Sequence, residues 1–209
     1  MKARPPVILL FLKSPVAGKV KTRLAAEIGD ARALAVYRRL VESQMERLPV
    51  GWNREILYTP APDFHLMRAW LGENGTFHPQ ADGDLGIRLE AGFAYAFQHG
   101  APLVCAIGGD CPGLSEVHFE ETQKVLESKK ADVVFGPAED GGYYLVAMRR
   151  PAPELFRNIP WSSSDTLAQS VKAAEALGSR VHLLPELADV DTLADCKKQG
   201  IPILPPARE

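Results

Sequence analysis

Residues 7–24 read VILLFLKSPVAGKVKTRL, an apolar run followed directly by a glycine-containing loop with four cations between Lys13 and Arg23. The apolar residues Val7 to Leu12 predict a strand buried on both faces, and the loop after such a strand lies at the carboxyl end of a sheet. Backbone N–H groups of a glycine-permitted turn and of a following helix, together with fixed cationic groups, attract phosphate. The stretch therefore suggests a nucleotide site, although it fits a solvated basic turn before an amphipathic helix equally well.

Two common nucleotide-binding motifs do not match this loop. A Walker A motif needs a glycine at position 13 and Ser or Thr at position 20, where Lys13 and Val20 stand. The GxGxxG dinucleotide fingerprint is also absent from the loop. If this loop binds a nucleotide, it does so without a Walker A motif or a GxGxxG fingerprint.

Composition sets the broad class of protein. The chain has 209 residues, a formal net charge of -2 and 46% hydrophobic residues, which fits one folded domain spanning residues 1–209. Such a charge argues against a nucleic-acid partner and against a broad anionic membrane surface. No apolar stretch is long enough to cross a bilayer, so we expect no membrane insertion and a cytoplasmic location. The three cysteines lack CxxC spacing, which favours neither a disulfide framework nor a zinc site.

Apolar strand-like runs alternate with helical patterns along the chain. The alternation predicts an α/β fold with a mostly parallel twisted sheet, helices on both faces and ligands beyond the carboxyl ends of the strands. The predicted strands are 7–12, 55–59, 103–107, 132–135, 143–148 and 181–184, and the predicted helices are 30–48, 63–71, 85–98 and 115–129.

Turn and cap signals add detail to this prediction. Only the short segment GPAEDGG separates the runs ending at Phe135 and beginning at Tyr143, so one antiparallel strand pair is expected there. The S-x-x-D pattern of residues 162–165 predicts a helix cap before a helix that stops at Gly178, and the T-x-x-D pattern of residues 192–195 predicts another cap. The final residues ILPPARE are predicted to be a loose tail.

Asp110 stands in the stretch LVCAIGGDCPG, at the end of an apolar strand. Two glycines before it let a ligand approach the backbone, and one aspartate at a strand end can hold Mg²⁺ together with phosphate oxygens. On this stretch alone, turn chemistry is the slightly better interpretation.

Three other acidic segments carry similar alternatives. In ADVDTLAD, Asp189 and Asp191 could reach an ion beside Asp110, while capping is the stronger local interpretation of Asp191. In EDGGYY, Asp140 suits a hairpin turn first, and a sugar contact or general base second. In GDLGIR, Asp84 is locally best explained as a helix cap.

Four ordered motifs resemble those of the DUF2064 family of GT-A-like transferases, which is related to nucleotide-diphospho-sugar transferases and to guanylyltransferases of molybdenum-cofactor and coenzyme F420 synthesis. The match spans nearly the whole chain, and four motifs in order are far more specific than one. The motifs are KSPVAGKVKTRL, GDLGIRL, IGGDCPGL and FGPAEDGGYYLVAM.

The resemblance implies a GT-A or nucleotide-diphospho-sugar transferase fold and a role for each matching residue. Nucleotide and phosphate binding would fall to Lys13, Gly18, Lys21, Arg23, Asp84 and Arg88. Asp110 would anchor Mg²⁺ or Mn²⁺ with Asp191 as second acidic partner, Asp110 and Asp140 would be catalytic, and Gly141 and Gly142 would face the sugar or acceptor.

The leading functional hypothesis is a metal-dependent glycosyltransferase that takes a sugar from a nucleotide-diphosphate donor and passes it to a small-molecule acceptor. An alternative is a nucleotidyltransferase that uses an NTP and a phosphorylated acceptor and releases pyrophosphate. A third is a nucleotide-binding protein without catalysis, suggested by Leu193 and Ala194, which replace the Pro and Glu of related sequences.

Overall fold

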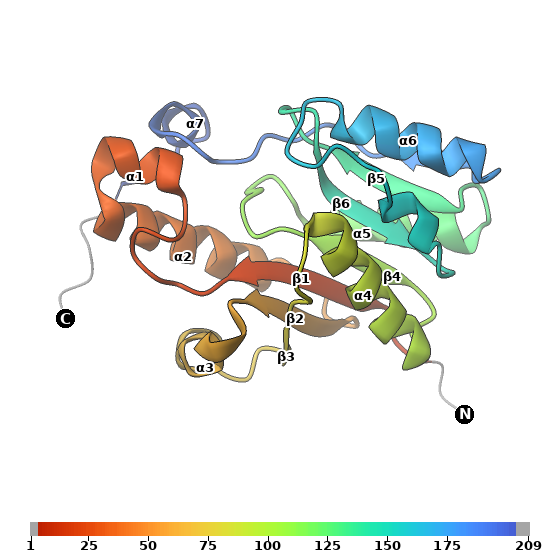
Figure 1. Cartoon of the computed structure of the whole chain (residues 1–209), viewed down its shortest axis with the longest axis horizontal. Coiled ribbons are helices and arrows are strands. Elements are labelled where there is room, and N and C mark those ends of the chain that lie inside the picture. The colour runs from red at the N-terminus through yellow and green to blue at the C-terminus, as the bar shows by residue number, and fades with distance from the viewer. Residues whose placement is uncertain (1–3, 204–209) are drawn as a thin grey trace.

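The molecule is built around a seven-stranded sheet. The computed structural model describes residues 4–203. Its spatial order is β3-β2-β1-β4-β6-β5-β7 (Figure 1). The strands are β1 (Val7–Lys13), β2 (Asn53–Thr59), β3 (Thr76–Pro79), β4 (Val104–Ile107), β5 (Val133–Pro137), β6 (Tyr143–Met148) and β7 (Val181–Leu183).

Strand β6 is antiparallel to both of its neighbours, β4 and β5, whereas the other pairings are parallel. The predicted antiparallel pair of β5 and β6 is confirmed, because the segment between them is too short for a crossover helix. The predicted mostly parallel α/β sheet is confirmed as well. The carboxyl ends of β3, β2, β1 and β4 therefore lie at one edge of the sheet.

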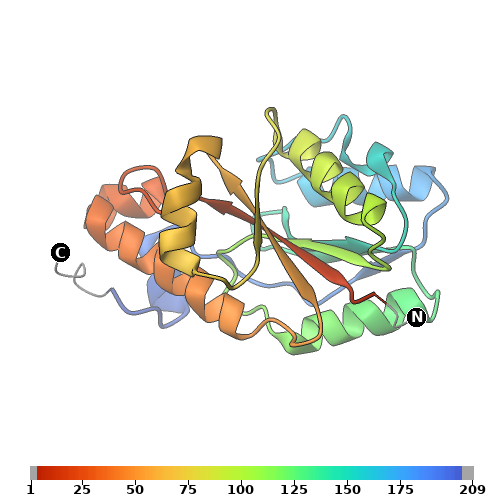
Figure 2. The same cartoon turned by 90° about the horizontal axis from the view of Figure 1, so that it is seen from below.

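Helices cover the sheet on two sides (Figure 2). Helices α4 and α6 pack against one face, and α2, α3 and α5 pack against the other. The helices are α1 (Thr22–Ile28), α2 (Asp30–Glu46), α3 (Phe64–Leu71), α4 (Leu85–Gln98), α5 (Glu116–Glu127), α6 (Thr166–Ala176) and α7 (Leu193–Lys198), with 3₁₀ turns at Ala61–Asp63 and Pro153–Phe156.

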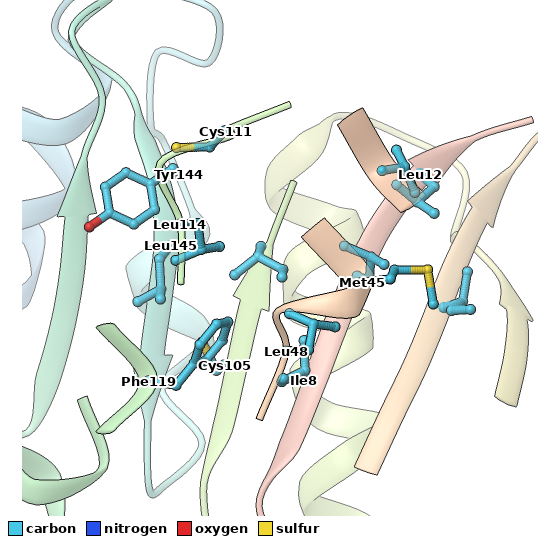
Figure 3. Close-up of a cluster of buried hydrophobic side chains, with 14 of the residues drawn as sticks. Ile8, Leu12, Met45, Leu48, Cys105, Cys111, Leu114, Phe119, Tyr144 and Leu145 are labelled. Atoms are coloured by element: carbon cyan, nitrogen blue, oxygen red, sulfur yellow. The ribbon is translucent and has the colours of Figure 1, made fainter. Parts of the chain in front are cut away.

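Strand β1 joins the two halves of the core. Its side chains alternate, so that Ile8, Leu10 and Leu12 enter the cluster under α2 and α5, while Val7 and Leu9 enter the cluster under α4. The first cluster is drawn in Figure 3, where Ile8 and Leu12 lie beside Met45 and Leu48. Burial on both faces explains why this strand reads as a continuous apolar run.

A third, smaller cluster joins helices that are far apart in the sequence. It contains Leu24 of α1, Leu40 of α2 and Cys196 of α7, together with Val190. Helix α7 begins at the predicted cap, since Thr192 and Asp195 form a reciprocal capping box. The cluster therefore fixes the segment before α7 against the loop that follows β1.

Three details differ from the sequence predictions or lie beyond them. Strand β3 was not predicted, because four edge residues with only partial burial carry little periodic signal. The predicted cap at residues 162–165 is wrong: Asp165 is the N-cap of α6 without a side-chain cap bond, and Ser162 has a positive φ of 61°. Most of the predicted tail, residues 204–209, lies outside the described residues.

Candidate nucleotide and metal site

A cavity of 420 Å³ opens beyond the carboxyl ends of β1, β2 and β4. Most of its lining comes from three places: the end of β1 with the loop that follows, the loop after β4, and the start of α4. The polar and charged lining residues are Lys13, Lys21, Thr22, Arg23, Tyr37, Thr59, Gln80, Arg88, Asp110 and Asp191. A volume of this size is in the range of small-ligand sites, about 300–1,000 Å³.

Lys21 connects the two carboxylates that the sequence analysis assigned to a metal. Its Nζ lies 3.1 Å from Asp110 Oδ2 and 2.8 Å from Asp191 Oδ1. The Lys21 side chain is 6% exposed, against 44% for Asp110 and 38% for Asp191. Burial acts to lower the pKa of Lys21, but the two carboxylates outweigh burial and raise this pKa above its usual value. Lys21 is therefore a charged ammonium at neutral pH.

The backbone of the loop after β1 has two positive φ angles. Gly18 has φ 75°, and a Cβ built at this position would lie 3.1 Å from Asp30 Oδ2, so the position suits glycine. Gly18 is not among the residues that line the cavity. Lys21 has φ 45° and ψ 49°, a left-handed conformation that is uncommon for a residue with a side chain.

Two hydrogen bonds hold the Asp191 segment beside Asp110. Val190 N donates to Asp110 O at 3.1 Å, and Cys111 Sγ donates to Ala188 O at 3.6 Å. Asp189, the other acid of this segment, does not line the cavity. Burial, then the negative charges of Asp110, Asp191 and Asp140, raise the pKa of Asp189 to about 6.

Helix α2 fixes the loop that carries Asp110. Gln44 Nε2 donates to Gly108 O at 2.7 Å, and Arg47 Nη1 donates to Pro112 O. These contacts hold one carbonyl before Asp110 and one after it. Gln44 and Arg47 were not predicted, because nothing in an amphipathic helix pattern marks which polar residue will meet a distant loop. The available signal was a glutamine on the apolar side of that pattern, where a polar residue is unusual. In the structure Gln44 is 1% exposed.

Arg88 is held at the opposite wall of the cavity. Its Nε donates to Gly83 O at 3.0 Å, and its Nη1 donates to Gln80 Oε1 at 3.1 Å. Gln80 Nε2 in turn donates to Leu12 O and Leu57 O, which ties it to the ends of β1 and β2. Gln80 was not predicted to take part in the site.

Asp84 caps helix α4. Its Oδ1 accepts a hydrogen bond from Ile87 N at 2.9 Å, and its side chain does not line the cavity. The structure therefore places Asp84 in the capping position that its local sequence favoured.

The EDGGYY segment forms a tight turn outside the cavity. Asp140 Oδ1 accepts from Gly142 N at 2.8 Å, and Gly141 has φ 86° and packs against the backbone of Ser164. Asp140 is exposed and is close enough to Asp189 to influence its pKa. This turn follows β5, which runs in the same direction as β4 because both are antiparallel to β6, so Asp140, Gly141 and Gly142 lie at the same edge of the sheet as the cavity without lining it.

The donor set at the cavity fits a divalent cation that keeps several other ligands. Asp110 and Asp191 both reach one cationic group, Lys21 Nζ, so an ammonium already stands where their negative charges meet. Within residues 4–203, no group of three or more His, Cys, Asp or Glu side chains is arranged to hold a metal. Mg²⁺ commonly takes one or two protein carboxylates and completes its shell with water and phosphate oxygens.

Comparison with known proteins shows the family to which the chain belongs. The model of the family "Uncharacterized protein conserved in bacteria (DUF2064)" matches residues 45–163. The chain is also 32% identical to a protein from Desulfovibrio desulfuricans G20, solved by crystallography and assigned as a nucleotide-diphospho-sugar transferase, with a TM-score of 0.88 over 95% of this chain and 87% of that one. The chain is a member of the DUF2064 family, as its motifs predicted.

More distant solved structures share the fold. A CMP:2-keto-3-deoxy-manno-octonic acid synthetase in complex with CTP is 15% identical, with a TM-score of 0.58 over 93% of this chain and 96% of that one. Rv0371C from Mycobacterium tuberculosis H37Rv, in complex with manganese, is 14% identical, with a TM-score of 0.56 over 92% of this chain and 97% of that one. A search of curated proteins found no match.

Among residues 4–203, no helix is long and apolar enough to span a membrane.

Proposed function

We propose that this protein is a metal-dependent glycosyltransferase that takes a sugar from a nucleotide-diphosphate donor. The observation that carries the proposal is the convergence of Lys13, Lys21, Arg23 and Arg88 with Asp110 and Asp191 around one cavity. A diphosphate is attracted to such cations, and two carboxylates suit the divalent ion that usually accompanies it.

Each cation at the cavity would have its own role in binding the donor. Arg23 is 78% exposed and lies 3.6 Å from Asp191 Oδ2, so its guanidinium is free to turn toward a phosphate. Lys13 and Lys21 would add charge on the same side, while Arg88, pinned by Gln80, would meet the nucleoside part. Cations gathered around the phosphates in this way stabilise the negative charge that develops on the leaving diphosphate.

Asp110 and Asp191 would hold Mg²⁺ or Mn²⁺ in this proposal. The metal, when bound, supplies a Lewis acid that neutralises charge on the phosphate oxygens. Gln44 and Arg47 would keep the Asp110 loop in place, since they bind the carbonyls on either side of it.

Asp140 would accept the proton of the acceptor hydroxyl, and Gly141 and Gly142 of the same turn would face the sugar or the acceptor. The Asp140 carboxylate uses Oδ1 for the Gly142 N–H. Within residues 4–203 the other oxygen, Oδ2, forms no hydrogen bond, so it can receive a proton. A general base of this kind typically contributes a factor of about 10²–10⁴ in rate.

A second candidate is a nucleotidyltransferase that joins an NTP to a phosphorylated acceptor and releases pyrophosphate. Four cations around one cavity suit a triphosphate as well as a diphosphate. The two activities differ in their products, so the purified protein should be incubated with each NTP and with each of several nucleotide sugars in the presence of Mg²⁺ or Mn²⁺.

Nucleotide-sugar turnover without release of pyrophosphate from any NTP supports the glycosyltransferase. Pyrophosphate release supports the second candidate instead. A thermal-shift screen of the same compounds, with and without the metal, identifies the nucleotide first, because a bound ligand raises the apparent stability. Tight binding without turnover of any donor would indicate a binding protein and contradict both enzymes.

A further inference from the structure

Lys21 Nζ lies between the two carboxylates that are proposed to hold the metal. Its ammonium contacts Asp110 and Asp191 at 3.1 and 2.8 Å, and its side chain is the most buried of the three. The three groups belong to the loop after β1, the loop after β4 and the segment before α7, so one side chain closes the site between three parts of the chain.

The backbone of Lys21 has an uncommon conformation. The residue is in the left-handed region, and its carbonyl accepts from Ala25 N at 2.8 Å at the start of α1. A residue with a side chain keeps this conformation only where its surroundings hold it there. Around Lys21 these surroundings include the two carboxylates on its ammonium and Ala25 N on its carbonyl.

We propose that Lys21 is a resident cation that keeps a divalent metal out of the Asp110–Asp191 pair until a phosphate-bearing ligand draws its ammonium away. The inference rests on the proposed function, because it takes the two carboxylates as the metal ligands. It couples two binding events: the metal and the diphosphate bind together, and each is held weakly without the other.

Charge balance gives the physical reason. With Lys21 in place, the two carboxylates already share one positive charge, and Arg23 lies 3.6 Å from Asp191 as a second. A divalent ion entering the same space would meet a like charge within a few ångströms, where repulsion in a partly buried site is strong. A diphosphate removes this conflict, since it offers Lys21 another anion and gives the metal further oxygen ligands.

The resulting coupling is reciprocal. If a diphosphate increases the affinity for the metal, the metal increases the affinity for the diphosphate by the same factor. A nucleotide site built in this way would bind the metal complex of its ligand and reject free metal. Lys21 then has two alternating partners, the carboxylates in the empty protein and the phosphate in the complex.

The test measures Mn²⁺ binding to the nucleotide-free protein, by electron paramagnetic resonance of the unbound ion, in the wild type and in Lys21→Met. The variant keeps a side chain of similar length and removes the charge. We expect Lys21→Met to bind Mn²⁺ about tenfold more tightly or better, because the competing charge is gone. The matched control is Lys19→Met, which removes an exposed lysine of the same loop that lacks an ion pair among the described residues.

The control should bind Mn²⁺ as the wild type does, within about twofold, since a solvated charge is screened. Lys21→Gln is a second variant in case the methionine disturbs folding, and a melting curve of each variant checks that the fold is kept. Unchanged or weaker Mn²⁺ binding in both Lys21 variants overturns the inference, and so does an equal gain in Lys19→Met.

A second arm uses pyrophosphate, the unit that nucleoside diphosphates share. In thermal-shift experiments we expect the wild type to respond to Mn²⁺ with pyrophosphate far more than to Mn²⁺ alone, and Lys21→Met to respond to Mn²⁺ alone. A wild type that responds fully to Mn²⁺ alone contradicts the inference. If no nucleotide or nucleotide sugar binds, the proposed function fails, while the Mn²⁺ titration still decides the role of Lys21.

Discussion

Tyr37 and Lys13 exchange two hydrogen bonds: Lys13 N donates to Tyr37 Oη at 3.1 Å, and Tyr37 Oη donates to Lys13 O at 2.8 Å. The phenol thus makes the hydrogen bonds that a neighbouring strand would make with the last residue of β1, where the loop of the site begins. Burial raises the pKa of Tyr37, so the hydroxyl stays protonated and able to donate. Helix α2 therefore sets the starting point of the cationic loop.

Tyr37→Phe should lower the free energy of unfolding by about 1–3 kcal/mol, since it leaves the N–H and C=O of Lys13 without this partner in a part-buried place. Chemical denaturation of the variant and the wild type measures the loss. Tyr95→Phe is the matched control, because Tyr95 is 38% exposed and its hydroxyl has no partner among the described residues. Equal stability of both variants would show that the two bonds with Lys13 contribute little.

Asp110→Asn should abolish Mg²⁺- or Mn²⁺-dependent donor binding and leave the fold intact, since a neutral amide is a poor ligand for these ions. Calorimetric titration of the donor with and without the metal checks the binding, and circular dichroism checks the fold. Metal-dependent affinity that is the same in the variant and the wild type counts against a metal at Asp110.

Arg23→Ala should weaken nucleotide binding, because each charge-assisted hydrogen bond to a phosphate is worth about 1.5–3 kcal/mol. The expected loss in affinity is roughly tenfold or more. Arg39→Ala serves as control, since Arg39 is an exposed residue of α2 that does not line the cavity. Equal affinities of the two variants would reject the phosphate-binding role of Arg23.

Asp140→Asn should reduce kcat by a factor of about 10²–10⁴ while leaving the affinity for the donor unchanged. The amide oxygen can still accept from Gly142 N, so the turn should be retained. Steady-state kinetics at varied donor and acceptor concentrations separates the two effects. A variant with full kcat would exclude Asp140 as the base, and one that fails to bind donor would place it in the donor site.

Asp132→Asn should change the pH dependence of stability. Three hydrogen bonds from Arg180, two from its guanidinium and one from its backbone N–H, and the charge of Arg180 lower the pKa of Asp132 to about 2. A lowered folded-state pKa means that the stabilisation is complete above the usual carboxyl pKa of about 4 and disappears as the pH falls through 2.

Because both side chains are about half exposed, the loss in Asp132→Asn at pH 7 should be only about 0.5–1 kcal/mol. Thermal melts at pH 7, 4 and 2.5 measure how the difference from the wild type shrinks with acidity. Asp82→Asn is the control, as Asp82 is exposed and forms no ion pair within residues 4–203. A difference that grows toward low pH would contradict the assignment.

Local sequence determined much of this protein. The apolar run of residues 7–12 is buried on both faces of the sheet, the short turn before Tyr143 enforces an antiparallel pair, and Thr192 caps a helix with Asp195. These features depend on residues a few positions apart, whose burial period and turn chemistry can be read directly. The four motifs in their order indicated the family in the same way.

Tertiary structure alone decided how the site is assembled. Lys21 and Asp191 are 170 positions apart, and only the packing of α1 and α7 on α2 brings them together. In the sequence, nothing distinguishes Tyr37, Gln44 and Arg47 from other residues of a helix. Their contacts with Lys13, Gly108 and Pro112 exist because α2 packs across the ends of β1 and β4. The physical reason is that hydrogen bonds and ion pairs depend on distance in space, which periodicity along the chain does not encode.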